Sequence, residues 1–102
     1  MYQLIFFAPV GFEEKIKEAL FAAGAGKYND YDKCCWQCLG KGQFRPLEGS
    51  EAFIGNTGTL EKVEEYRIEM LCQEQYLKKA IEALKESHPY EEPAYYAVKT
   101  FI

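Results

Sequence analysis

The chain has 102 residues and a formal net charge of −4, with 48% hydrophobic and 16% aromatic residues. This length is typical of one domain, and the apolar content excludes a disordered chain. Lysine and glutamate are interspersed, so no basic stripe exists to neutralise phosphates, and we expect no direct binding of nucleic acid. We expect a single domain over residues 1–102.

An almost continuous apolar run, Gln3 to Ala8, predicts a strand covered on both faces. The run is too short to span a bilayer and has no basic flank or cleavage site, so we expect neither a membrane segment nor a signal peptide, and a cytoplasmic protein. A helical period follows, with apolar residues on one face at Phe12, Ile16, Ala19, Leu20 and Ala23. Gly24 and Gly26 supply its C-terminal stop.

The middle of the chain has weaker signals. Lys33 to Leu39 is a β-type segment, and Gly40-Lys-Gly42 predicts a turn into a short strand, Gln43 to Arg45. Leu47 to Glu61 has no clear period. A loop of that length is uncommon in a compact domain and is often functional or forms an interface.

Alternation returns between Glu64 and Cys72 and predicts a strand with one apolar and one mostly charged face. A second amphipathic helix follows, which must end before Pro89 because proline disfavours helical geometry at the preceding residue. The final strand is expected from Ala94 to Ile102. The apolar face of the second helix contains Leu77, Ala80, Ile81 and Leu84.

These elements predict an α+β, ferredoxin-like βαββαβ domain, with two helices on one face of an antiparallel sheet. The other sheet face then has no cover within the chain. It combines charged residues with aromatics and cysteine, a mixture suited to subunit packing. We therefore expect a homo-oligomer, a trimer or a dimer, and the pattern leaves both open.

The most distinctive string is His88-Pro-Tyr-Glu-Glu-Pro93, between the second helix and the last strand. It places the only imidazole beside a phenol and two carboxylates, a set that could bind a metal or a polar ligand. The simpler interpretation is a rigid connection in which His88 satisfies the helix end and Tyr90 packs against a neighbour. A single histidine supplies fewer strong ligands than most metal sites have, which favours that interpretation.

Cys34-Cys-Trp-Gln-Cys38 contains a CxxC spacing. In a predicted strand these thiols alternate between faces instead of converging, and no second pair is present, so we interpret them as buried packing thiols. Cys34 and Cys38 remain weak metal candidates together with His88. Four cysteines without a secretory signal also fit a reducing, cytoplasmic location.

No catalytic constellation emerges from the remaining residues. The glycines from Gly40 onward have no phosphate-loop spacing, and any serine- or cysteine-based triad would need His88. We therefore expect a protein that is not an enzyme. The acidic positions of the alternating strand are interpreted as a solvated or interfacial face: Glu61, Glu64, Glu65 and Glu69.

Several strings together resemble one known domain. They are Ala23-Gly-Ala-Gly26, Tyr31-Asp-Lys-Cys34, Gly40-Lys-Gly-Gln-Phe-Arg-Pro-Leu-Glu-Gly49, Phe53-Ile-Gly55, Val63-Glu-Glu65 and His88-Pro-Tyr-Glu-Glu-Pro-Ala94. Over essentially the whole chain they resemble the PII/CutA-like domain inserted in the NGG-interacting-factor-three (NIF3-like) family of dinuclear-metal hexamers. His88-Pro-Tyr-Glu91 is also similar to a string of the CutA divalent-cation-tolerance family, whose members form trimers.

The resemblance implies a stand-alone accessory domain, because the segments that hold the two metals in that family are absent from this sequence. We expect a non-catalytic module for ligand binding, partner binding or assembly, with no cofactor. Its cleft would combine residues 40–49 with His88 and Glu91 as polar ligand groups, Arg45 as an anion contact, and Tyr90 and Glu92. The alternative is a CutA-like protein that binds copper or zinc through His88 and a nearby cysteine.

Overall fold

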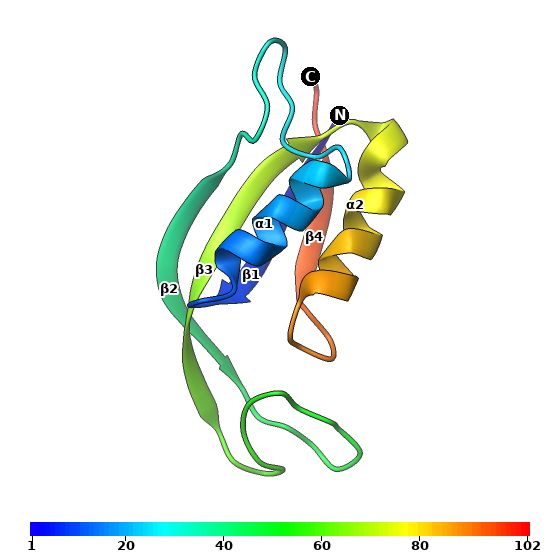
Figure 1. The fold of residues 1–102 in the computed structure, drawn as a ribbon. Coiled ribbons are helices and arrows are strands. Elements are labelled where there is room, and N and C mark those ends of the chain that lie inside the picture. The colour runs from blue at the N-terminus through cyan, green and yellow to red at the C-terminus, as the bar shows by residue number, and fades with distance from the viewer.

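The computed structural model describes all residues, 1–102, and has the predicted element order. Its sheet order is β2-β3-β1-β4 with every neighbouring pair antiparallel, and both helices lie side by side on one face (Figure 1). The ferredoxin-like prediction is therefore confirmed. The elements are β1 (Tyr2–Pro9), α1 (Glu13–Ala22), β2 (Trp36–Phe44), β3 (Glu61–Cys72), α2 (Glu74–Ser87) and β4 (Tyr95–Lys99).

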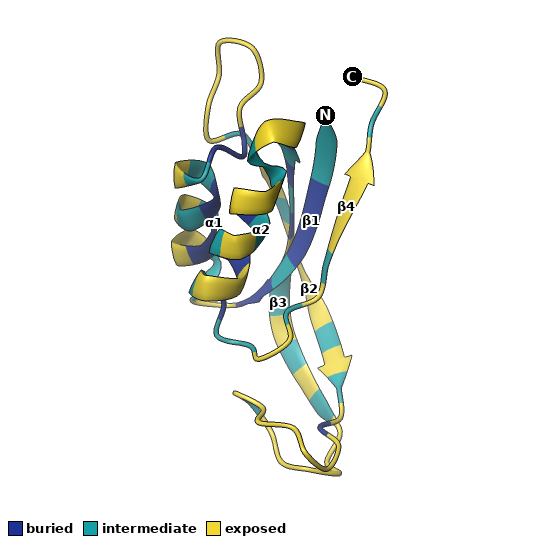
Figure 2. Ribbon diagram, turned by 90° about the vertical axis from the view of Figure 1, so that its right-hand side faces the viewer, coloured by how far each residue is buried: buried dark blue, intermediate teal, exposed yellow.

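The hydrophobic core lies between the helices and the two central strands (Figure 2). Alternation along β1 turns Leu4, Phe6 and Ala8 toward the helices, and Leu4 and Phe6 pair with Met70 and Ile68 of β3. Burying each large apolar side chain stabilises the fold by about 1.5–3 kcal/mol. The helices contribute Ile16, Leu20, Ala80 and Leu84.

The structure differs from the sequence-based expectation in β2. Residues 40–42 form no turn; they continue a single nine-residue strand in which Gly40 and Gly42 pair with Glu65 and Val63 of β3. Glycine is a weak strand former, but the ladder to β3 satisfies its backbone groups. The pairing of β1 with β3 ends at Pro9 and Glu65. Past this point β2 and β3 continue as a two-stranded extension, residues 41–44 and 61–64, which is called the β2–β3 arm below.

The predicted end of α2 is confirmed. Pro89 disfavours helical geometry at the residue before it, and His88 accordingly has an extended backbone with φ −81° and ψ 136°. Its N–H still donates to the carbonyl of Leu84, at 3.0 Å. The chain therefore leaves the helix at His88 and turns toward the end of β1.

The sheet face opposite the helices has no cover (Figure 2). Trp36 of β2 is 59% exposed and Tyr96 of β4 is 54% exposed, with the charged Arg67 and Glu69 of β3 between them. At one end of the sheet the two chain ends meet, since Thr100 N–H donates to the carbonyl of Met1 at 2.9 Å. None of the helices combines the length and the apolar character needed to cross a membrane.

Candidate functional site: a cavity beside the β2–β3 arm

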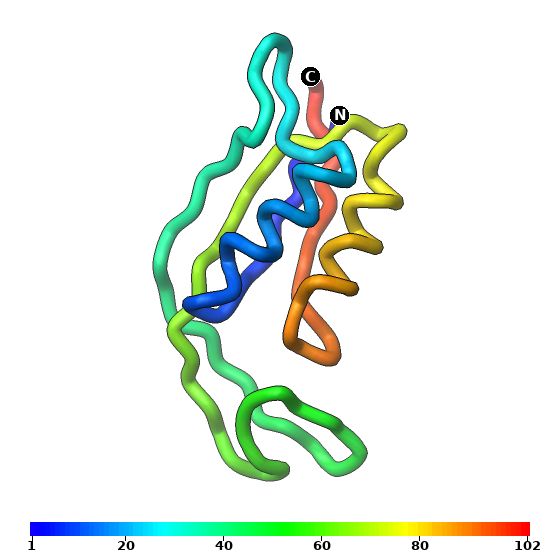
Figure 3. Tube along the Cα trace, viewed as in Figure 1, coloured from blue at the N-terminus to red at the C-terminus, as the bar shows by residue number.

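The loop of residues 45–60 curls back from the tip of the β2–β3 arm (Figure 3). Its own hydrogen bonds hold this shape: Gly58 N–H donates to the carbonyl of Pro46 at 2.7 Å, and Ser50 Oγ donates to the carbonyl of Leu47 at 2.7 Å. The Phe53 ring packs edge-on against Phe12, with centroids 5.7 Å apart. The long loop is thus an ordered wall.

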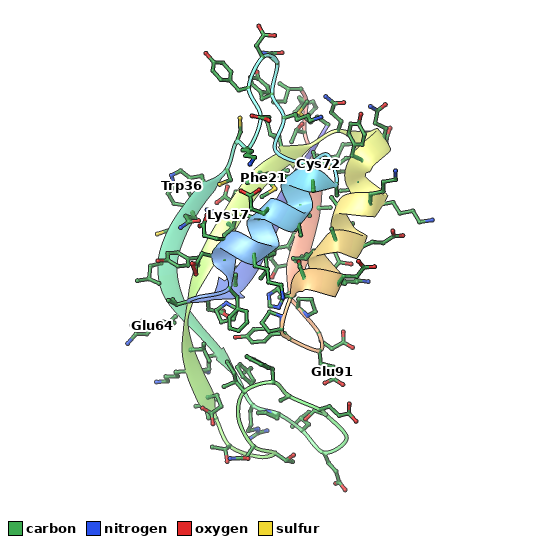
Figure 4. All side chains as sticks on the ribbon, viewed as in Figure 1. Lys17, Phe21, Trp36, Glu64, Cys72 and Glu91 are labelled. Atoms are coloured by element: carbon green, nitrogen blue, oxygen red, sulfur yellow. The ribbon has the colours of Figure 1, made fainter.

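Residues 88–94, the connection between α2 and β4, form the opposite wall. A hydrogen bond between a backbone N–H and a side chain joins the two walls, since Glu51 N–H donates to Glu91 Oε2 at 3.0 Å. Figure 4 shows Glu91 where this connection faces the loop. Two segments about 40 positions apart in the sequence therefore border one space.

That space is a cavity of about 570 Å³, a size that suits a small organic ligand. The aromatic rings of Phe7, Phe44, Phe53 and Tyr90 contribute to its lining. The charged residues at the cavity are Arg45, Glu65, Glu91 and Glu92.

Glu65 places a carboxylate in the wall of this cavity. Tyr90 Oη donates a hydrogen bond to Glu65 Oε2 at 3.2 Å. Burial raises the pKa of Glu65, and the hydrogen bond from Tyr90 opposes this in part. Burial, followed by the charge and hydrogen bond of Glu65, raises the pKa of Tyr90 to about 12. A Cβ at position 42 would overlap the Glu65 carboxylate, so Gly42 supplies the room for it.

His88 lies behind the cavity wall and is only 7% exposed. Its Nε2 is 2.6 Å from the carbonyl oxygen of Phe7, and its Nδ1 accepts the N–H of Tyr90 at 3.0 Å. These partners fix the neutral tautomer with the proton on Nε2. Burial lowers the pKa of His88, although the bond to Phe7 favours the charged ring. His88 thereby holds Tyr90 in position without lining the cavity.

The structure brings Arg45, Tyr90, Glu91 and Glu92 around the cavity, together with residues 42–47 of the predicted cleft. Their role as ligand groups stays a prediction. Sequence reasoning missed Glu65, which it treated as part of a solvated or interfacial strand face. It also missed Phe7, Phe44 and Phe53, which carry no signal separating them from core aromatics.

The three residues named as weak metal candidates lie apart. Cys34 follows α1 and hydrogen-bonds through its N–H to the carbonyl of Gly26, Cys38 pairs with Arg67 of β3, and His88 lies at the end of β1. No group of three or more His, Cys, Asp and Glu side chains is placed to hold a metal ion. The expectation of buried thiols is wrong for Cys35 and Cys38, which are exposed. Cys35 precedes β2, and Cys38 lies opposite Arg67 on this edge strand, on the sheet face away from the helices.

Comparisons with known proteins relate the chain to part of a larger protein. No protein-family model matches. The "GTP cyclohydrolase 1 type 2 homolog" of Halalkalibacterium halodurans is 44% identical over 95 residues, which is 93% of this chain and 26% of that protein. The protein of the same name from Bacillus subtilis is 42% identical over 93 residues, or 91% of this chain and 25% of that protein. The chain thus spans about a quarter of these relatives.

Solved structures agree with this relationship. A Bacillus cereus protein related to NIF3 superposes on 99% of this chain and 26% of its own, with a TM-score of 0.85 and 37% identity. The periplasmic divalent cation tolerance protein CutA of Archaeoglobus fulgidus covers the whole chain and 86% of its own, with a TM-score of 0.71; at 18% identity it shows the fold alone. The chain is therefore homologous to a CutA-like domain region of NIF3-related proteins, the GTP cyclohydrolase 1 type 2 homologs.

Proposed function

We propose that this domain is a non-catalytic binding module that takes a small, largely apolar molecule into the cavity beside the β2–β3 arm. The observation that carries the proposal is an open-sided cavity of about 570 Å³ between two walls joined by the Glu51–Glu91 hydrogen bond. Pockets of this size with aromatic walls and a few polar groups are the usual form of small-molecule sites.

The state of the only imidazole supports a binding role over a catalytic one. Both ring nitrogens of His88 are engaged with backbone groups, so the ring has no free position for proton transfer to a ligand. The aligned part of this chain covers only 26% of the first of these relatives. Within a protein of that kind, we infer that this domain contributes ligand recognition and that any reaction belongs to other segments.

The test is a titration of isotope-labelled protein with a library of small aromatic and aliphatic fragments, followed by amide NMR shifts. We expect shifts to gather at Phe44, Phe53 and Tyr90. Ala52→Trp places a large ring at the lining of the cavity and should abolish these shifts. Thr59→Trp is the matched control, since Thr59 is exposed in the same loop and outside the lining. A library with no fragment that shifts the lining residues would refute the proposal.

We further propose that the uncovered sheet face joins copies of the chain into a closed homo-oligomer. Support comes from the exposure of Trp36, Tyr96 and Val98 on this face, because large exposed apolar side chains in one area often mark contact surfaces. Native mass spectrometry of untagged protein should show a dimer or trimer. Trp36→Lys should shift it to monomer, whereas Tyr31→Lys, in an exposed loop, should not. A wild-type monomer at micromolar concentration would refute this assembly.

A further inference from the structure

We propose that the cavity selects organic cations, an ammonium or guanidinium group on an apolar or aromatic body, through the carboxylate of Glu65. This inference rests on the proposed function, that the cavity binds a small molecule. It adds the chemical class of the ligand and the residue that selects it.

Glu65 lacks a cationic partner in the protein. The ion pairs of the structure join Lys17 to Glu14, Lys33 to Glu18 and Arg67 to Glu69, so none includes Glu65. Oε2 of Glu65 accepts the Tyr90 hydroxyl, whereas Oε1 lies against Gly42, another lining residue, without a hydrogen-bond donor from the protein. One oxygen therefore remains available to a donor inside the cavity.

The surroundings of this carboxylate favour a cation physically. A carboxylate partly removed from water is destabilised unless an opposite charge or hydrogen-bond donors compensate, and burial does raise the pKa of Glu65. A bound ammonium would supply that compensation through a charge-assisted hydrogen bond. Phe7, Phe44 and Tyr90 line the same cavity, and aromatic rings attract cations at their faces.

The charges at the rim point the same way. Glu91 and Glu92 line the same cavity as Glu65, together with the single cation Arg45. Arg45 forms no ion pair, and its charge is exposed to solvent screening to the same degree as those of the exposed Glu91 and Glu92. An anion held by Arg45 would have to lie in a cavity with three carboxylates in its lining.

Three ligands that share one aromatic body test the charge directly: 2-phenylethylamine, 2-phenylethanol and 3-phenylpropionate, each titrated at pH 7 and followed by amide NMR shifts at the cavity. In wild-type protein we expect the amine to bind roughly tenfold more tightly than the alcohol, as one charge-assisted hydrogen bond implies. The carboxylate should bind more weakly than the alcohol. This comparison needs no variant.

Variants then locate the selecting group. Glu65→Gln should bring the amine to the affinity of the alcohol. Glu64→Gln is the matched control, because it removes the same charge from the neighbouring position, where the side chain is exposed and outside the cavity lining (Figure 4). That variant should keep the preference.

Equal binding of the three ligands, or an amine preference that Glu65→Gln leaves intact, would overturn the inference and leave the binding function standing. A preference for the carboxylate that disappears in Arg45→Gln would also overturn it and identify an anion site. If no fragment of any charge binds at the cavity, the proposed function fails together with the inference.

Discussion

Replacing His88 tests how the second wall of the cavity is held. The ring joins Phe7 at the end of β1 to Tyr90 in the α2–β4 connection through two hydrogen bonds. His88→Ala removes both bonds and leaves a half-buried carbonyl and N–H without partners. His88→Asn is the informative comparison, because an asparagine oxygen can accept the N–H two residues ahead and so replace Nδ1, while the bond to Phe7 is lost.

The magnitudes follow from these contacts. Each hydrogen bond contributes about 0.5–1.5 kcal/mol net, and a buried group left unpaired costs about 1–3 kcal/mol. We therefore expect His88→Ala to lower the free energy of unfolding by about 2–4 kcal/mol, and His88→Asn by about half of that. In a domain of this size, 1 kcal/mol corresponds to roughly 4–8 °C in the melting temperature.

The wild-type protein should also carry a pH dependence that both variants lack. Burial puts the pKa of His88 in the folded state below its ordinary value of 6.5. The unfolded chain therefore binds more protons near this pH, and stability rises with pH. The contribution of His88 is fully present above about pH 6.5 and is lost as the pH falls from there through the lowered pKa.

Urea denaturation followed by circular dichroism between pH 5 and pH 8 measures both effects. Subtracting the His88→Asn curve from the wild-type curve removes the titration of the carboxylates that the two proteins share. A His88→Ala protein within about 0.5 kcal/mol of wild type, the range of ordinary surface substitutions, would refute this account of the ring. So would a difference curve that stays flat across the pH range.

Tyr90→Phe should cost about 1 kcal/mol at neutral pH through loss of the hydrogen bond to Glu65. Because the pKa of Tyr90 is raised to about 12 in the folded state, wild-type stability should fall as the pH rises above 10, more steeply than the stability of the variant. Urea denaturation of both proteins at pH 8 and pH 10.5 measures this difference. An equal loss of stability in the two proteins would contradict it. Gly24→Ala should destabilise strongly, since Gly24 has φ +111° and an added Cβ would lie 2.6 Å from the Tyr76 ring. Gly58→Ala is its control, with φ +81° but open space around the Cβ, and equal melting temperatures for the two variants would show that the Tyr76 contact does not matter.

Strong periodicity explains which parts of the fold were predictable. α1, β3 and α2 each carry apolar residues with one clear period, β1 is an almost continuous apolar run, and Pro89 sets the end of α2. Gly40 and Gly42 misled the prediction of β2, because glycine pairs in isolation favour a turn, whereas here the ladder to β3 decides. The register of β2 against β3 cannot be read from residues 40–42 alone.

The same limit applies to the site. Tyr90, Glu91 and Glu92 stand out because proline brackets them and they follow the only histidine. Glu65 enters the cavity only because it lies opposite Gly40 and beside Gly42, and because the 45–60 loop folds back over this part of the sheet. Both facts are tertiary and have no counterpart in the spacing of residues along the chain.

The hydrogen bond between Thr100 and Met1 bears on how such a domain can occur within a longer polypeptide. Since the first and last strands, β1 and β4, are antiparallel neighbours, a chain that carries this unit enters and leaves it at nearly one point. A host fold could accept the unit at a surface turn with little displacement of its own flanking segments. Removing it would likewise leave two ends close enough to be rejoined by a short linker. Adjacent ends thus give this architecture modularity, whatever molecule its cavity binds.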